Sequence, residues 1–184
     1  MTENTILKKN SISFGPSGRA VAQEIDDNLL QNLYQHLTME RNASVQYFSI
    51  SLWFKEKNLN GFSSFFLQES KAEMDHSYKF SDYIIARGQT VNLQQLPAPI
   101  QEWKSIEEII SFAFNMESDL TASLQQIYSI SDRSADTRTN VFLDPIVEAQ
   151  INSEDEFATI LGKVKFSNNQ PSALLILDGE LNKK

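Results

Sequence analysis

The feature that most constrains the fold is a helical stripe of aromatic side chains interrupted by ionisable residues. Steps of four and three positions keep side chains on one face of an α-helix. Taken at those steps, the stripe reads Phe62, Phe66, Glu69, Glu73, His76, Phe80 and Tyr83. An aromatic helix face belongs in a protein core, where unpaired ionisable groups are costly to bury. The stripe therefore predicts a long core helix, together with partners elsewhere in the chain that compensate its charged centre.

Four other segments have helical character, so we predict an all-α chain. The predicted helices cover about 26–57, 62–87, 105–130, 137–165 and 171–181. Asp26 and Asp27 are good capping residues for the first helix. Ser105, followed three residues later by Glu108, has the capping-box pattern at the start of the third. Pro145 lies inside the fourth helix and is expected to kink it, because proline removes one backbone hydrogen bond.

A proline-containing segment without helical period, 88–104, separates the second and third predicted helices. A helix of about 27 residues is about 40 Å long at about 1.5 Å per residue. The segment reaches about 56 to 61 Å when extended. It is therefore long enough to span a bundle and bring the third helix parallel to the second. This predicts a four-helix bundle of two antiparallel hairpins joined by a long crossover.

Length and composition fit a single domain over 1–184, with 41% hydrophobic residues. Residues 1–25 show no clear period, and we predict an arm that packs on another surface or is partly mobile. Residues 26–166 form the predicted bundle, and 171–181 form a short fifth helix that begins at Pro171.

Charge and cysteine content narrow the class of protein. The net charge of −8 argues against nucleic acid as the main partner. No apolar run is long enough for a membrane span, and the first 20 residues do not have the pattern of a secretion signal. The absence of cysteine excludes disulfides and thiolate metal sites. We therefore predict a cytoplasmic protein without a membrane partner.

An internal spacing indicates where the charged stripe finds its partners. Glu40 and Glu73 are 33 positions apart, as are Glu117 and Gln150. Each lies near the middle of its predicted helix, so the four side chains are expected to meet at one level of the bundle. The first hairpin supplies Glu-x-x-His, whereas the second supplies Gln-x-x-Ser, which ends at Ser153.

Three carboxylates and one imidazole around a shared point form an oxygen-rich metal site. Such a ligand set suits Fe(II), Mn(II) or Zn(II) better than copper, and a bridging carboxylate lets it hold two ions.

At these positions the chain resembles the ferritins, over about 26–181. The residues that carry the resemblance are Glu40, Tyr47, Glu73, His76, Glu117 and Gln150. The resemblance implies a four-helix bundle plus a fifth helix, assembled as a homo-oligomeric, hollow shell of 24 subunits. It also implies oxidation of Fe(II) by oxygen at a di-iron ferroxidase centre, with ferric mineral stored inside the shell.

The resemblance also assigns roles to individual residues. Glu40, Glu73 and His76 would bind the first iron, with Glu73 bridging to the second. Glu117 would be the main ligand of the second iron, with Gln150 as the neutral residue beside it in animal heavy-chain-type ferritins. Tyr47 corresponds to the tyrosine that can supply an electron.

Departures from the family pattern limit what carries over. Bacterioferritins have a second Glu-x-x-His, which Gln150 and Ser153 do not provide. Met74 lies at the position of the haem-binding methionine of bacterioferritins, but haem-free ferritins also have methionine there, so no haem is expected. The carboxylates of a third iron site, found in many bacterial ferritins, are absent. Their positions hold Ala72, Ala149, Asn152 and Ser153.

Several residues have two interpretations. Gln150 either coordinates metal or hydrogen-bonds a ligand carboxylate. Tyr47 is either redox-active or a buried tyrosine bonded to a polar group such as Glu117. Glu69 is either a ligand that passes iron inward or a solvated residue. His36 is expected at the surface.

Asp144 and Glu148 either line a pore between subunits, as in ferritin three-fold pores, or are ordinary surface acids. Two other functions also remain open. One is a non-catalytic shell subunit, and the other is a di-iron oxidase or peroxidase on the same bundle that stores no iron.

Overall fold

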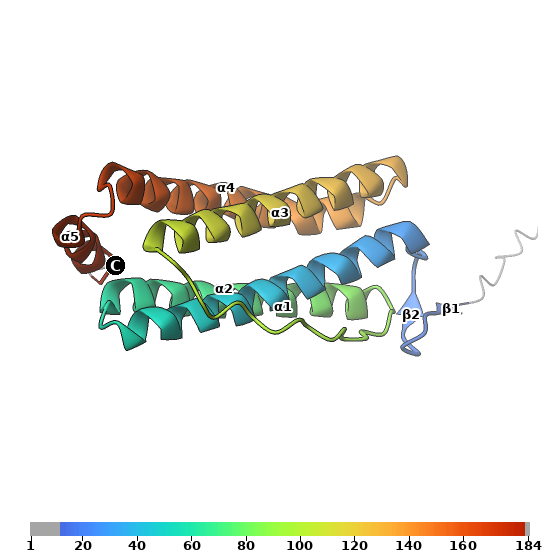
Figure 1. Ribbon diagram of the computed structural model, residues 1–184. Coiled ribbons are helices and arrows are strands. Elements are labelled where there is room, and N and C mark those ends of the chain that lie inside the picture. The colour runs from blue at the N-terminus through green and yellow to red at the C-terminus, as the bar shows by residue number, and fades with distance from the viewer. Residues whose placement is uncertain (1–11, 183–184) are drawn as a thin grey trace, which may run out of the picture.

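The computed structural model describes residues 12–182, and the chain within them folds into a long bundle with an added helix across one end (Figure 1). The predicted all-α class is confirmed, apart from a two-stranded hairpin near the start. The elements are β1 (Ser13–Phe14), β2 (Ala20–Val21), α1 (Asp27–Glu56), α2 (Asn60–Ala86), α3 (Ile106–Arg133), α4 (Thr137–Phe166) and α5 (Pro171–Leu181). Within the described residues, no helix combines the length and apolar character needed to cross a membrane.

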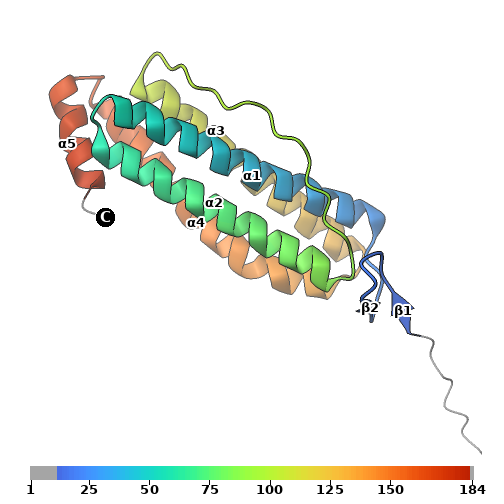
Figure 2. The ribbon, with the colours of Figure 1, turned by 90° about the horizontal axis from the view of Figure 1, so that it is seen from below.

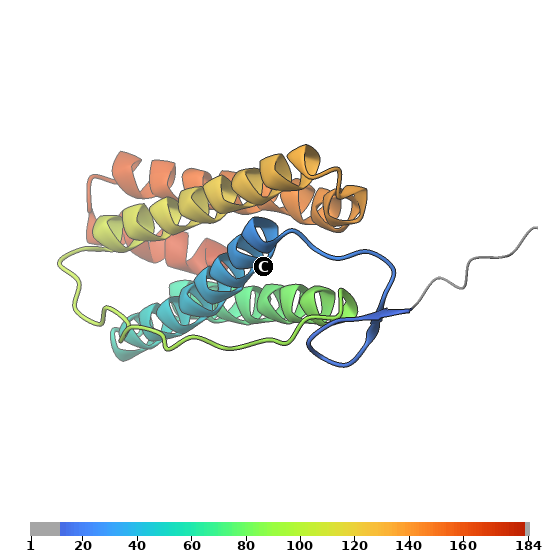
Figure 3. The same cartoon turned by 90° about the vertical axis from the view of Figure 1, so that its right-hand side faces the viewer.

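The four long helices form two layers, one of α1 with α2 and one of α3 with α4 (Figures 1 and 3). Neighbouring helices within each layer are antiparallel. The segment after α2 runs along the outside of α1 for the length of the bundle before α3 begins (Figure 2). The predicted crossover topology is therefore confirmed. Gln46 of α1 holds this segment through its side-chain amide, which accepts from the Ile100 N–H at 2.8 Å and donates to the Ile100 carbonyl at 2.9 Å.

Helix boundaries agree with the sequence patterns at most ends. Asp26 accepts from the Leu29 N–H at 2.9 Å, as its capping role predicts. Ser105 accepts from the Glu108 N–H, but the Glu108 carboxylate bonds the N–H of Lys104 rather than that of Ser105.

Two predicted boundaries were wrong by a few residues. The second helix begins at Asn60 rather than Phe62, and the third continues through Ser131 to Arg133. Helix α4 is continuous across Pro145, and the predicted kink there stays a prediction.

The hydrophobic core divides into two clusters, one toward each end of the bundle. The cluster beside α5 contains Tyr47, Phe54, Phe62, Phe66 and Phe157. The other contains Leu33, Leu37, Phe80, Ile84 and Leu124. Buried polar side chains lie in the middle of the helices, where the two clusters meet, including Glu40, Glu73, Glu117 and Gln150. The four mid-helix polar residues that were predicted to meet all lie in this layer.

Glycines near both ends of α2 allow other segments to approach closely. Gly61 lies so near α5 that a Cβ atom there would come within 1.7 Å of the Asp178 carbonyl oxygen. The Asp178 carboxylate in turn accepts from the Phe62 N–H at 2.9 Å. At the other end, Gly88 has φ +81°, and a Cβ atom there would meet Val21 at 2.2 Å. The N-terminal hairpin is thus seated on the start of the crossover, where Ser17 donates to the Gly88 carbonyl at 2.8 Å.

Over the part that the structure describes, the predicted N-terminal arm therefore contacts the crossover through Ser17 and α4 through Gln23, while most of its residues are exposed. Residues 1–11, which belong to the same prediction, lie outside the described residues.

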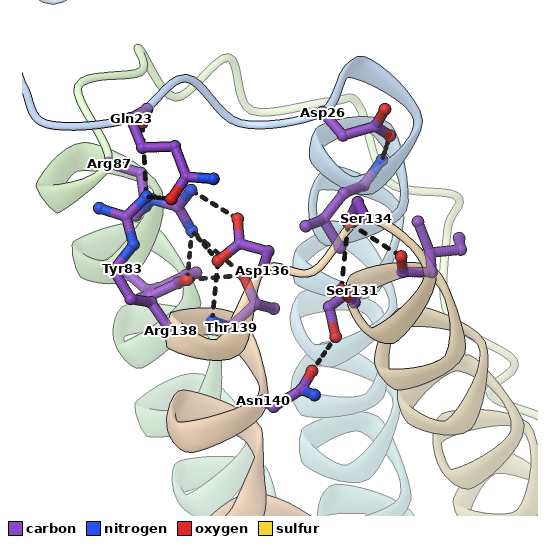
Figure 4. A network of polar contacts seen from close by, with 12 residues as sticks. Gln23, Asp26, Tyr83, Arg87, Ser131, Ser134, Asp136, Arg138, Thr139 and Asn140 are labelled. Carbon is purple, nitrogen blue, oxygen red and sulfur yellow. Dashed lines mark hydrogen bonds and ion pairs between the residues drawn. The ribbon is translucent and has the colours of Figure 1, made fainter.

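An ion pair ties α2 to the start of α4 at this end of the bundle (Figure 4). Arg87 Nη2 lies 2.6 Å from Asp136 Oδ2, and both residues are buried. Arg87 also donates to the Tyr83 hydroxyl at 2.6 Å, and Asp136 caps α4 by accepting from the Thr139 N–H at 3.2 Å.

Candidate metal centre

Glu73 and His76 occupy one face of α2, and Glu40 meets them from α1. Positions three apart are neighbours on a helix, and His76 Nδ1 lies 2.9 Å from Glu73 Oε2. Glu40 Oε2 lies 3.8 Å from the same nitrogen. One potential ligand atom from each of the three residues lies within 4.8 Å of the other two. The structure therefore brings together three of the residues predicted to bind metal.

These carboxylates are too deeply buried to stay charged without compensation. Glu40 and Glu73 are 2% and 3% exposed, and His76 is partly open to solvent. Burial raises the pKa of Glu40. Burial, together with the neighbouring Glu40, raises the pKa of Glu73 to about 7, although His76 acts to lower it.

A second observation shows that the three residues fit a cation. Glu40 Oε2 is buried and has no hydrogen-bond partner among the described residues. A divalent cation beside this oxygen would supply the missing interaction and favour the charged carboxylates. Two carboxylates and an imidazole are donors that suit Fe(II).

Glu117 of α3 is held by hydrogen bonds from two other helices. The hydroxyl of Tyr47 donates to its Oε1, and the amide of Gln150 donates to its Oε2 at 2.9 Å. Burial and the charge of Glu73 raise the pKa of Glu117 to about 7, although the two hydrogen bonds act to lower it. Glu117 therefore interacts with Glu73 by charge, but it lies outside the compact group of three.

The contacts of Gln150 and Tyr47 favour one of the two interpretations given for each. Gln150 also donates to the Glu117 carbonyl at 3.2 Å, so its amide nitrogen orients a candidate ligand. Its direct coordination of metal stays a prediction. Tyr47 is fully buried, and burial with the charge of Glu117 raises its pKa well above 10, so the phenol stays protonated and donates. Its ring stacks on Phe157 with centroids 5.6 Å apart.

Glu69 lies one turn before Glu73 on α2 and outside the compact group. It is partly exposed, which places it between the buried carboxylates and the solvent. Burial, together with the charges of Glu156, Glu73 and Glu117, raises its pKa to about 8. The negative charge of these carboxylates would attract a cation toward Glu69. The role of Glu69 in passing iron inward stays a prediction.

The raised pKa of Glu69 makes a prediction about stability. Because its folded pKa of about 8 lies above 4.5, the ordinary value for a glutamate side chain, folding favours the protonated form. That stabilisation is complete below about pH 4.5 and is lost as the pH rises through about 8. Glutamine mimics the neutral form at every pH. The melting temperature of metal-free Glu69→Gln minus that of the metal-free wild type should therefore be higher at pH 9 than at pH 5, by about 2 °C or more.

The control for this comparison is Asp75→Asn, which removes an exposed carboxylate from the same helix. Differential scanning calorimetry at the two pH values measures the effect. An equal difference in melting temperature between Glu69→Gln and the wild type at pH 5 and pH 9 would contradict the raised pKa of Glu69.

The expected surface position of His36 was wrong. His36 is fully buried, with Nδ1 2.9 Å from Ser123 Oγ and Nε2 2.8 Å from Glu40 Oε1. Burial lowers its pKa to about 3. The sequence contained the signal, because Leu33, His36 and Glu40 follow the same steps of three and four that define the core stripe of α2.

The structure also places the remaining candidates. Asp144 is exposed and accepts from the Tyr128 hydroxyl at 3.1 Å, and Glu148 is exposed on the same helix. Lining of a pore by these two residues stays a prediction. Met74 is partly buried and contacts the Ser77 hydroxyl through its sulfur at 3.5 Å. Glu154, to which the sequence assigned no role, accepts a hydrogen bond from Thr121, one turn after Glu117.

Comparisons with known proteins agree with this geometry. Residues 30–167 match the family model described as a ferritin-like domain. The bacterial non-heme ferritin of Staphylococcus haemolyticus is 27% identical over 157 residues, which cover 85% of this chain and 95% of that protein. A probable bacterial non-heme ferritin-like protein of Haemophilus influenzae is 25% identical, with 85% and 95% covered.

Solved structures are similar over most of the chain. The open pore ferritin of the archaeon Archaeoglobus fulgidus superimposes with a TM-score of 0.84 at 25% identity, covering 88% of this chain and 99% of that one. An iron-soaked variant of PmFTN gives 0.80 at 32% identity, covering 83% and 98%. Together with the bundle and its carboxylate layer, these matches show that the chain belongs to the ferritin family.

Proposed function

We propose that this chain is the subunit of an iron-storing ferritin that oxidises Fe(II) with oxygen at a di-iron centre inside each subunit. The observation that carries the proposal is the convergence of Glu40, Glu73 and His76 within 4.8 Å in a buried layer. The unpartnered Glu40 oxygen and the raised pKa values of Glu40 and Glu73 support the proposal, because they indicate more negative charge in this layer than His76 alone compensates.

In the proposed reaction, Fe(II) is the substrate and each residue has a distinct role. Glu40, Glu73 and His76 bind the first iron. Glu73 also bridges to the second iron, for which Glu117 is the main ligand. Negative carboxylates stabilise Fe(III) relative to Fe(II), so they favour loss of an electron from each iron to oxygen. Carboxylates also shift between terminal and bridging modes, which helps the oxidised iron to leave.

The two iron positions are unequal. The first has two carboxylates and the His76 imidazole, whereas the second has Glu117, the shared Glu73 and the Gln150 amide. Both oxygens of Glu117 already accept hydrogen bonds, from Tyr47 and Gln150. The second iron should therefore be held more loosely than the first. In this proposal Tyr47, which donates a hydrogen bond to Glu117, keeps the electron-supplying role that the family resemblance assigns to it.

Storage requires a closed shell, and we propose the 24-subunit assembly of the family. In this proposal the whole chain is one domain, acts in the cytoplasm and needs no haem. The end of the bundle at helix α5 favours assembly into a shell over an oxidase that acts as a single subunit. The helix is attached to the bundle through Gly61 and Asp178 but leaves Phe166, Leu175 and Ile176 exposed, at 94%, 61% and 67%. Apolar side chains exposed together at one end favour contact with other subunits.

The proposal is tested by adding Fe(II) aerobically to the metal-free protein and following ferric absorbance and oxygen uptake. Oxidation well above that of the Glu73→Ala variant is expected. Oxidation no faster than in that variant would contradict catalysis and favour a non-catalytic shell subunit. Size-exclusion chromatography of the same sample tests storage, because a particle far below the mass of 24 subunits would favour a di-iron oxidase that stores no iron.

A further inference from the structure

His36 lies beside the proposed first iron position and has no role in the reaction described so far. Helix α1 places it one turn before Glu40, and its side chain is fully buried. A fully buried histidine next to a carboxylate needs partners for both ring nitrogens, because unpaired buried polar atoms are costly.

Three helices hold the imidazole ring in place. Nδ1 lies 2.9 Å from the hydroxyl oxygen of Ser123, which projects from α3. The ring packs on that of Phe80 from α2, with centroids 4.5 Å apart and planes at 51°. Nε2 lies 2.8 Å from Glu40 Oε1. The orientation of His36 is thus set by groups other than the carboxylate that it meets.

The two oxygens of Glu40 face different neighbours. Oε1 lies against His36, whereas Oε2 lies on the side of His76 and has no hydrogen-bond partner among the described residues. Only Oε2 is therefore both unpartnered and directed toward the other candidate ligands. Oε2 is therefore the oxygen of Glu40 that can bind an ion without losing a contact.

The donors and acceptors assign the hydrogen on the ring. A carboxylate only accepts hydrogen bonds, whereas a serine hydroxyl can donate or accept. When Glu40 is ionised, as an iron ligand is, Nε2 therefore carries the ring hydrogen on the side of Glu40, and Nδ1 accepts from Ser123. In the metal-free chain Nε2 is close to Oε1 but forms no aligned hydrogen bond. The hydrogen bond forms if the Glu40 carboxylate or the ring turns until Nε2–H points at Oε1.

We propose that His36 is a positioning residue for the first iron, holding Glu40 Oε1 through Nε2–H so that Glu40 binds iron through Oε2 alone. The inference rests on the proposed function, because it assigns a supporting contact to the same centre. It differs from direct ligation by His36. The compact ligand group of the described residues comprises Glu40, Glu73 and His76 without the His36 nitrogen.

The test is anaerobic titration with Co(II), whose visible absorption reports the number and kind of its ligands without any oxidation of iron. His36→Leu removes the N–H and should weaken binding at the first site by about 10- to 100-fold, the usual cost of losing a group that orients a ligand. Ser123→Ala frees the ring and should cause a smaller loss. His36→Gln, whose amide can also donate to Glu40, should restore affinity to within a few-fold of the wild type.

Gln46→Leu is the matched control, because it removes a buried polar side chain from the same helix whose contacts are with the crossover. It should leave Co(II) affinity unchanged. Circular dichroism of each variant shows whether it has folded, and Ser123→Ala, at a partly exposed position, keeps the test valid if His36→Leu does not fold.

The outcomes separate the inference from the proposed function. Absence of Co(II) binding by the wild type would overturn both. Wild-type binding that is equally strong in His36→Leu and Ser123→Ala would overturn the inference alone. If His36→Gln binds as weakly as His36→Leu and its spectrum shows one nitrogen ligand fewer than the wild type, His36 is a ligand, and the positioning role is wrong. A Co(II)-loaded crystal structure should show Glu40 bound through Oε2 only, and binding through both oxygens would contradict the inference.

Discussion

Replacing Glu73 by alanine is expected to lower the initial rate of aerobic Fe(II) oxidation by at least about 100-fold. In the proposed centre Glu73 is the one carboxylate shared by both irons, and it also holds His76 through the 2.9 Å contact. Loss of a group that only orients a ligand already costs about 10- to 100-fold in affinity or activity. Loss of a shared ligand should cost at least the upper end of that range. Stopped-flow absorbance of ferric iron, at two Fe(II) per subunit, measures the rate.

Two further variants make this prediction specific. Glu117→Ala removes a ligand of the second iron alone, so the first iron should still bind while oxidation slows. Asp82→Ala removes an exposed carboxylate from the same helix as Glu73 and should oxidise iron like the wild type. Equal rates in Glu73→Ala and Asp82→Ala would show that oxidation occurs outside the proposed centre, at surface acids or at growing mineral.

The bundle and its topology could be predicted because their signals lie within short stretches of sequence. The steps of four and three in the stripe around Glu73 define a helix face without reference to other segments. The reach of residues 88–104, compared with the length of a helix, favours the crossover on geometry alone. The short hairpin at Ser13–Val21 was missed because each strand has only two residues, too few to show a period of two, and because its turn contacts Gly88, which is far away in sequence.

The sequence predicted which residues meet at the candidate site, but not how their side chains are oriented. The spacing of 33 places Glu40 beside Glu73 and Gln150 beside Glu117, and the structure shows the second pair in hydrogen-bond contact. The spacing cannot say which way an amide or a ring turns. The donation from Gln150 to Glu117 and the burial of His36 depend on side chains from different helices, and such contacts follow only from the assembled bundle.

The ion pair between Arg87 and Asp136 is another contact of this kind. It joins residues 49 positions apart, from the end of α2 and the start of α4 (Figure 4). Burial alone would raise the pKa of Asp136, but hydrogen bonds and charge from Arg87 lower it. The pair joins the two layers of the bundle at the end opposite α5, beside the N-terminal hairpin (Figure 1).

Asp136→Ala is expected to lower the free energy of unfolding by about 3–5 kcal/mol, the largest effect on stability that we predict. Removing one partner of a buried pair leaves the other charge uncompensated, and Arg87 is only 5% exposed. Asp136→Ala also loses the helix-capping hydrogen bond from the Thr139 N–H. Asparagine is also a good capping residue, so Asp136→Asn should lose less stability. Urea unfolding of the metal-free protein at pH 7, followed by circular dichroism, measures the difference.

The pH dependence separates the ion pair from the cap. Because the folded pKa of Asp136 lies below its unfolded value, the contribution of its charge is present above the unfolded pKa. It is lost as the pH falls through the folded pKa. The stability difference between the wild type and Asp136→Asn should therefore shrink in acid, whereas Asp132→Ala, at an exposed position near the end of α3, should change stability little at either pH. A loss in Asp136→Asn that is equal at pH 7 and pH 3 would assign the stabilisation to packing and hydrogen bonds, because the charge on Asp136 would then contribute nothing.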